Sequence, residues 1–193
     1  TGAVVNNDYH ALTTELALGF KDFISPDAPD IYPEELRADI DALNVIIYAD
    51  FNLAVNLAAL VTNQKDYEYY YDRIFARLDW LEERLSKQRY LMGDTITDSD
   101  IRIFPTLARF DLVFYQKYLV NKKRLVDYPN LWNYAKDLYS NPAFGGTTDF
   151  DSMRKRFYYL DHTPFEDLPR LVPKGPDDSI WLEPNDRAEK FGK

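Results

Sequence analysis

The chain has 193 residues, of which 46% are hydrophobic and 28% charged, and it contains no cysteine. This length suffices for one ordinary domain, or a domain with an appendage, without a stabilising metal or disulfide. The lack of cysteine excludes a disulfide framework, a zinc–thiolate site and a thiol nucleophile carried by this chain. A net charge of −9 disfavours binding to nucleic acid or to an anionic membrane.

The hydropathy pattern favours a cytoplasmic protein with no membrane partner. No uninterrupted run of about 18 apolar residues occurs, so no transmembrane helix is expected. The first residues combine neither the charged region nor the hydrophobic core of a signal peptide. The two histidines are far apart in the pattern and do not form a metal pair, so no metal is expected.

The first predicted element is a short helix that begins at Asn7 or Asp8, either of which can cap it, and ends near Phe23. The proline-containing stretch 25–32 cannot continue a helix and predicts a linker. A long helix follows from Pro33, whose fixed φ suits the first helical position. Its first half carries one apolar stripe with 4-3-4 spacing, formed by Leu36, Ile40, Leu43 and Ile47.

The second half of this helix, 51–61, is apolar on nearly every side, which indicates burial on more than one face. Within it, Asn52 and Asn56 lie one turn apart on the same face. A second long helix has apolar residues at 4-3-4-3-4 spacing from Tyr67 to Leu85 and a charged opposite face. Further helices are predicted at about 97–118, 129–140 and 149–159.

The last 33 residues, 161–193, contain 5 of the 11 prolines and predict an irregular arm on the surface of the helical body. The pattern therefore predicts an all-α bundle with an irregular, proline-rich C-terminal arm.

A capping motif marks the start of the helix predicted near residue 97. Thr97 is a predicted N-cap, and Asp100 can return a hydrogen bond to its amide, as in a capping box. Ile96 and Ile101 occupy the two positions of a hydrophobic staple. By itself this motif is a folding device, because any helix can begin in this way.

Together with the residues that follow, this motif resembles the C-terminal domain of the xi-class glutathione transferases, the glutathionyl-hydroquinone reductases. The resemblance runs from about Val4 to Pro176, and each motif is weak alone whereas the ordered set is specific. The upstream motifs are Tyr32-Pro33-Glu34-Glu35-Leu36-Arg37 and Ile40-Asp41-Ala42-Leu43-Asn44. The downstream motifs are Arg109-Phe110-Asp111, Asp127-Tyr128-Pro129-Asn130-Leu131-Trp132, Asp137-Leu138-Tyr139, Phe150-Asp151 and Val172-Pro173-Lys174-Gly175-Pro176.

The resemblance implies a glutathione-transferase C-terminal-type helical bundle within a two-domain protein. Residues 1–24 would be the strand end and last helix of a thioredoxin-like domain, 25–32 a linker, 33–160 the helical domain and 161–193 the arm. In the family, a cysteine of the thioredoxin-like domain attacks a glutathionyl-hydroquinone and releases the hydroquinone, and a second glutathione regenerates it. This chain contains no such cysteine, so we expect the N-terminal half of the protein to lie outside it.

The resemblance places the thiol cofactor at Asn7, Asp8 and Tyr9. In the family, a Glu-Ser pair at positions 8 and 9 holds the γ-glutamyl end of glutathione, beside the free amides of a helix N-terminus. Asp8 keeps the charge, but Tyr9 cannot copy a serine hydroxyl, so the co-substrate is glutathione or another low-molecular-weight thiol. The alternative for Asp8 is a plain N-cap.

The resemblance also implies a pocket for a small aromatic substrate, lined by tyrosines of the helical domain. Two of the family's tyrosines align with Asn56 and Phe157, and Tyr158 keeps a third, whose hydroxyl would donate to the departing quinol oxygen as an auxiliary catalytic group. Phe114 or Phe157 would offer a ring face to the substrate. The alternatives are a buried polar spacer for Asn56 and a core residue for Tyr158.

Two classes of function are therefore open. The first is the helical half of a thiol-dependent reductase, expected to form a homodimer and to be inactive without its N-terminal domain. The second is a non-catalytic, transferase-like binding or scaffold module, which the replacement of two tyrosines at Asn56 and Phe157 favours.

Overall fold

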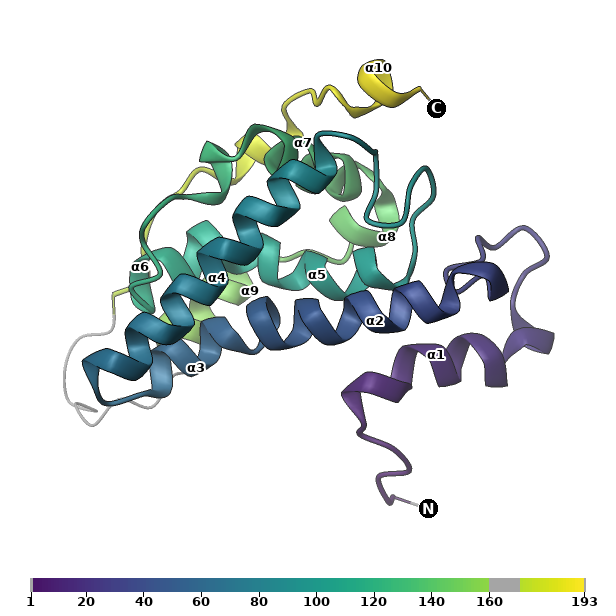
Figure 1. The fold of residues 1–193 in the computed structure, drawn as a ribbon, viewed down its shortest axis with the longest axis horizontal. Helices are drawn as coiled ribbons and strands as arrows, with labels where there is room; N and C mark the ends of the chain where they lie inside the picture. The colour runs from purple at the N-terminus through teal and green to yellow at the C-terminus, as the bar shows by residue number, and fades with distance from the viewer. Residues whose placement is uncertain (1, 160–170, 193) are drawn as a thin grey trace.

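The computed structural model describes residues 2–159 and 171–192, and all regular elements in these ranges are helical (Figure 1). The predicted all-α fold is confirmed for this part of the chain. Residues 161–170 of the predicted arm lie outside the described residues.

The N-terminal helix α1, Tyr9–Gly19, and the 3₁₀ turn Lys21–Phe23 correspond to the first predicted helix. Residues 2–8 precede them without regular structure. Figure 1 shows α1 as a separate rod that runs beside α2. No residue of α1 is buried, so few apolar contacts hold it against the bundle.

The long predicted helix is a succession of helical segments. A 3₁₀ turn, Glu34–Leu36, leads into α2, Arg37–Ile47, and a π-helical stretch, Tyr48–Asn52, connects α2 to α3, Ala54–Leu60. Pro33 lies one residue before the first turn instead of within it, because its ψ of 141° is extended. The predicted stripe faces the core, with Ile40, Leu43 and Ile47 at most 6% exposed.

The segment Glu34–Leu60 is also the one helix in the described ranges that is long and apolar enough to cross a membrane. This is weak evidence for a membrane span, because a core helix of a soluble protein meets the same criterion. Phe51, Ala54 and Val55 in its second half are fully buried in the bundle, whereas Leu60 is 73% exposed.

The rest of the bundle forms around α5, Asp98–Arg109, which continues through a π-helical stretch, Phe110–Phe114, into α6, Tyr115–Lys117. Residues Ile103, Leu107 and Phe110 of this central rod are fully buried. The surrounding elements are α4 (Gln64–Leu85), the 3₁₀ turn Leu125–Asp127, α7 (Pro129–Ser140), α8 (Pro142–Gly145), α9 (Phe150–Arg154) and the π-helical stretch Lys155–Tyr159.

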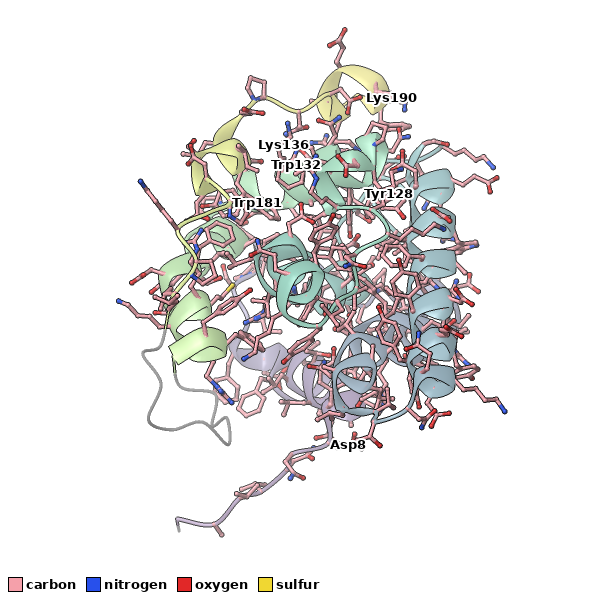
Figure 2. The ribbon with its side chains drawn as sticks, turned by 90° about the vertical axis from the view of Figure 1, so that its left-hand side faces the viewer. Asp8, Tyr128, Trp132, Lys136, Trp181 and Lys190 are labelled. Atoms are coloured by element: carbon pink, nitrogen blue, oxygen red, sulfur yellow. The ribbon has the colours of Figure 1, made fainter. Side chains whose placement is uncertain are left out.

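The C-terminal arm contains two short helical segments, the 3₁₀ turn Asp178–Leu182 and α10, Arg187–Phe191. Trp181 is 8% exposed, and its ring lies 4.7 Å from that of Trp132, centroid to centroid (Figure 2). These contacts attach the arm to the end of the bundle opposite Asp8 (Figure 2).

Candidate functional site

The predicted thiol-binding residues lie at the N-terminus of α1. Asn7 and Asp8 are exposed, and Oδ1 of Asp8 accepts a 2.9 Å hydrogen bond from the His10 amide. Asp8 is thus the N-cap of α1, as the alternative to a thiol-binding role predicted. An exposed carboxylate at a helix start remains accessible to a cationic group of a ligand.

The side chain of Tyr9 contacts the helical bundle. Its ring lies 5.0 Å from the ring of Tyr48, and its hydroxyl accepts a 3.3 Å hydrogen bond from Nδ2 of Asn52. Tyr9 therefore joins the N-terminal segment to the π-helical stretch between α2 and α3.

A cavity of about 630 Å³ lies beside the turn between α3 and α4 and extends to α6. Asn56, Tyr67, Lys117 and Leu119 are among the residues that line it. One N–H of the Asn56 amide donates to the Asn52 carbonyl at 2.9 Å, which leaves the rest of the amide group for contacts within the cavity. The Tyr67 hydroxyl donates to the Leu119 carbonyl at 2.7 Å and holds the far wall in place.

An aromatic cluster lies beside this cavity. The ring of Phe114 lies 5.4 Å from that of Tyr118 and 6.2 Å from that of Phe157. Phe114 is only 3% exposed, so its ring packs within the core. The Tyr158 hydroxyl donates to the Leu112 carbonyl at 3.2 Å, and burial raises the pKa of this phenol above its ordinary value.

Lys117 connects the cavity to the aromatic cluster. It lines the cavity together with Asn56, its ammonium lies 5.6 Å from the centroid of the Tyr158 ring, and it donates to the Phe157 carbonyl. Tyr158 and Phe114 are not among the cavity-lining side chains of the described part of the chain. That Asn56 and Tyr158 converge on one cavity facing residues 7–9 stays a prediction.

The capping residues Thr97 and Asp100 lie in the core at the start of α5. Oδ2 of Asp100 accepts hydrogen bonds from the amide of Thr97 at 2.8 Å and from its hydroxyl at 3.0 Å. Oδ1 accepts from the Leu91 amide at 3.0 Å and from the Tyr134 hydroxyl at 2.6 Å. Burial raises the pKa of Asp100, and these four hydrogen bonds oppose the rise. Their role is structural.

Arg102 links α5 to α1 and was not among the residues predicted from the sequence. Its guanidinium pairs with Asp98 and donates to the carbonyls of Tyr9 and His10. The i, i+4 spacing of Asp98 and Arg102 is the signal from which the ion pair can be predicted. In residues 2–159 and 171–192 no group of acidic residues and histidines is arranged to hold a metal ion.

Residues 64–137 match the protein family described as glutathione S-transferase, C-terminal domain. The glutathionyl-hydroquinone reductase PcpF of Sphingobium chlorophenolicum is 35% identical over 173 residues, which are 90% of this chain and 54% of PcpF. The chain spans about half the length of the curated relatives it matches.

Two solved structures support the same relationship. A glutathione transferase from Gordonia bronchialis is 43% identical, with a TM-score of 0.92 over 100% of this chain and 59% of that chain. The glutathione-bound structure of YqjG, a glutathione transferase homologue from Escherichia coli, is 31% identical, with a TM-score of 0.87 over 98% of this chain and 60% of that one. Residues 64–137 therefore belong to the glutathione S-transferase C-terminal domain family, and the proteins similar to the chain include glutathionyl-hydroquinone reductases and an Xi-class glutathione transferase.

Proposed function

We propose that this chain is the helical, substrate-binding half of a thiol-dependent, glutathione transferase-like reductase that acts on glutathionyl-hydroquinones or similar aromatic conjugates. The observation that carries the proposal is the match of 90% of the chain to PcpF, a glutathionyl-hydroquinone reductase. Because the chain has no cysteine, the nucleophile would lie in an N-terminal thioredoxin-like domain outside residues 1–193.

The surface of α1 supports this domain arrangement. Leu12, Leu16 and Phe20 are 40%, 50% and 56% exposed, and Phe23 beyond the helix is 85% exposed. A contiguous apolar surface of this kind is typical of a face that another part of a protein covers. We assign residues 1–24 to the end of the thioredoxin-like domain, 25–32 to the linker, 33–160 to the helical domain and 161–193 to the arm.

Glutathione is the co-substrate that the relatives support best, because two of their structures are described as containing glutathione. In this proposal Asn7, Asp8 and Tyr9 hold the thiol at the N-terminus of α1. The Asp8 carboxylate would pair with the ammonium of the γ-glutamyl group. The positive N-terminal end of the α1 dipole would favour the carboxylate of that same γ-glutamyl group.

The small aromatic substrate would occupy the cavity at Asn56 and approach Phe157 and Tyr158. The 3.2 Å hydrogen bond from Tyr158 to the Leu112 carbonyl is longer than the 2.7–2.8 Å typical of an O–H donor. Exchanging this weak bond for one to a phenolate would stabilise the departing hydroquinone oxygen. Phe114 would support the Phe157 ring from behind.

We further propose a cytoplasmic homodimer built largely from the helical domains. Val45 and Ile46 of α2 are 60% and 40% exposed, as expected of residues that a second subunit covers. Light scattering at tens of micromolar should give twice the mass of the polypeptide. A monomer at that concentration would contradict this part of the proposal.

A non-catalytic binding module is the second candidate, because Asn56 and Phe157 stand where the family has tyrosines. The intact mass of the polypeptide as expressed in its host separates the two. A mass larger than 22.6 kDa by a domain allows the family's chemistry, and that protein should reduce a glutathionyl-hydroquinone in the presence of glutathione. A mass of 22.6 kDa, or no turnover by the larger protein, favours the binding module.

A further inference from the structure

We propose that Arg102 is a positioning residue that locks the start of α1 onto the first turns of α5. If the proposed function holds, this lock sets the distance between the thiol-binding residues 7–9 and the cavity at Asn56. The docking itself is a property of the described chain and is testable without any activity.

Three acceptors of the N-terminal segment converge on one guanidinium. Nη1 of Arg102 donates to the Tyr9 carbonyl at 2.8 Å, and Nη2 donates to the His10 carbonyl at 3.0 Å and to the hydroxyl of Thr13. The two carbonyls belong to the first turn of α1, and a carbonyl oxygen has a second lone pair for such a donor. The guanidinium also lies 5.2 Å from the centroid of the Tyr9 ring, within cation–π distance.

The guanidinium is held in place from the bundle side. Its Nε donates to Oδ2 of Asp98 at 2.5 Å, and the side chains of Arg102 and Asp98 are 5% and 1% exposed. Oδ2 of Asp98 also accepts a hydrogen bond from Nδ2 of Asn44 at 2.8 Å. The Ser99 hydroxyl donates to Oδ1 of Asn44 at 2.8 Å. This buried network holds the planar guanidinium of Arg102 in one orientation. The contacts of Arg102 with α1 therefore cost little side-chain entropy.

Other contacts between α1 and the bundle are few, and they include the rings of Tyr9 and His10, which lie 5.0 Å and 4.5 Å from the ring of Tyr48. No residue of α1 is buried, and within the described ranges the remaining hydrogen bond from the bundle is the 3.3 Å contact of Asn52 with the Tyr9 hydroxyl. An isolated helix of 11 residues is marginal in water. Loss of the Arg102 contacts should therefore free α1 and unfold it.

The same turn of α5 also holds the linker. The amide of Asp98 donates to the Ile31 carbonyl at 2.8 Å, so Asp98 fixes the end of the linker while Arg102 fixes the start of α1. These two connections between the N-terminal segment and the bundle thus lie within one turn of α5.

Hydrogen exchange of the α1 amides in this chain tests the lock. Arg102→Ala should speed exchange of these amides at least tenfold while the amides of α4 and α7 stay protected. Thr13→Val removes one bond from the α1 side without altering the bundle, and it should speed exchange about threefold. Thr14→Val is the matched control, because the Thr14 hydroxyl donates to the Ala11 carbonyl within α1 and should leave exchange unchanged.

Arg102→Lys should restore only part of the protection, since an ammonium cannot reproduce the planar fork. If Arg102→Ala unfolds the bundle, Thr13→Val against Thr14→Val decides the outcome alone. Equal exchange in these two variants would overturn the lock.

A longer polypeptide that includes the thioredoxin-like domain tests the consequence for the thiol. There Thr13→Val should raise KM for glutathione about threefold and leave kcat within twofold. Faster α1 exchange with an unchanged KM would keep the lock and refute the placement of the thiol at residues 7–9. Unchanged exchange with a raised KM would refute the lock.

Discussion

The hydroxyl of Tyr134 on α7 donates a 2.6 Å hydrogen bond to Oδ1 of Asp100 on α5, and both side chains are fully buried. Asp100 therefore does more than complete a capping box. It joins the start of α5 to α7 and to the amide of Leu91 in the preceding loop. Asp100 thus forms a junction of three segments, which are α5, α7 and the loop that contains Leu91.

Because of this junction, we expect substitution of Asp100 to lower the free energy of unfolding more than substitution of Thr97. Thr97→Ala should lower the free energy of unfolding by about 1 kcal/mol through loss of the cap. Asp100→Ala should cost about 3 kcal/mol, because it leaves several buried donors without an acceptor. Urea unfolding measures both, with the exposed Asp94→Ala as a control expected within about 0.5 kcal/mol of the parent. Equal losses for the Thr97 and Asp100 variants would contradict the junction.

Asp50 predicts a pH-dependent contribution to stability. Burial alone would raise the pKa of this carboxyl, but hydrogen bonds from Arg77 at 2.6 Å and from Arg73 bring it below its ordinary value. A lowered folded-state pKa means that the stabilisation is present above the unfolded-state pKa of about 4 and disappears as the pH falls through the folded-state value.

Asp50→Asn should therefore lower the free energy of unfolding by about 1 kcal/mol at pH 7 and by less as the pH falls from 4 to 3. Urea unfolding across this range follows the difference. Glu83→Gln is the matched control, because its partner Lys87 lies on the surface and the pair is 70% and 68% exposed. A constant difference for Asp50→Asn at all pH values would mean that the ion pairs do not contribute.

Arg187 in the C-terminal arm predicts that α10 stabilises the end of α4. Its guanidinium is fully buried and donates to the carbonyls of Leu85 and Arg89, both at 2.7 Å, and of Gln88. The Leu85 carbonyl lies at the negative end of the α4 dipole, where a cation is favourable, and the other two carbonyls belong to the loop that follows.

Arg187→Ala should lower the free energy of unfolding by about 3 kcal/mol, because several buried carbonyls lose their donor. It should also make the arm a substrate for limited proteolysis. Arg187→Lys should restore less than half of the loss, since one ammonium cannot reach all three acceptors. Lys190→Ala on the same helix, whose exposed ammonium donates to Oδ1 of the half-buried Asn130, should stay within about 0.5 kcal/mol of the parent.

The sequence predicted the helices because their apolar spacing and caps are local signals. Ile40, Leu43 and Ile47 are buried as the stripe predicts, and α5 begins directly after Thr97. The π-helical stretch 48–52 was not predicted, because one extra residue per turn leaves no signature in composition. Packing across the bundle decides where such a turn occurs.

For the candidate site, the sequence predicted which kinds of side chain take part but not which groups they contact. Asn52 and Asn56 share a face, as expected, but the acceptor that Asn56 uses is a backbone carbonyl, which no side-chain pattern encodes. Arg102 was missed for a related reason. Two of its partners in α1 are carbonyls 92 and 93 residues away, and only the fold brings them together.

In a polypeptide that includes the catalytic domain, the Tyr158 hydroxyl should affect turnover more than stability. Tyr158→Phe should lower kcat on a glutathionyl-hydroquinone about tenfold or more, because it removes a hydrogen-bond donor to the departing oxygen. Its free energy of unfolding should fall by only about 1 kcal/mol, since the lost bond to the Leu112 carbonyl is a single long contact. Steady-state kinetics and urea unfolding of the same preparation separate the two effects.

Tyr139→Phe is the matched control for this variant. Tyr139 stacks on Phe150 with 5.8 Å between ring centroids, beside Trp181 and not at the cavity, so its hydroxyl should not affect turnover. Because burial raises the pKa of Tyr158, the parent should keep its advantage over Tyr158→Phe at about pH 10, where an ordinary phenol is half ionised. Equal turnover of parent and Tyr158→Phe would make Tyr158 a packing residue and leave the binding module as the better interpretation.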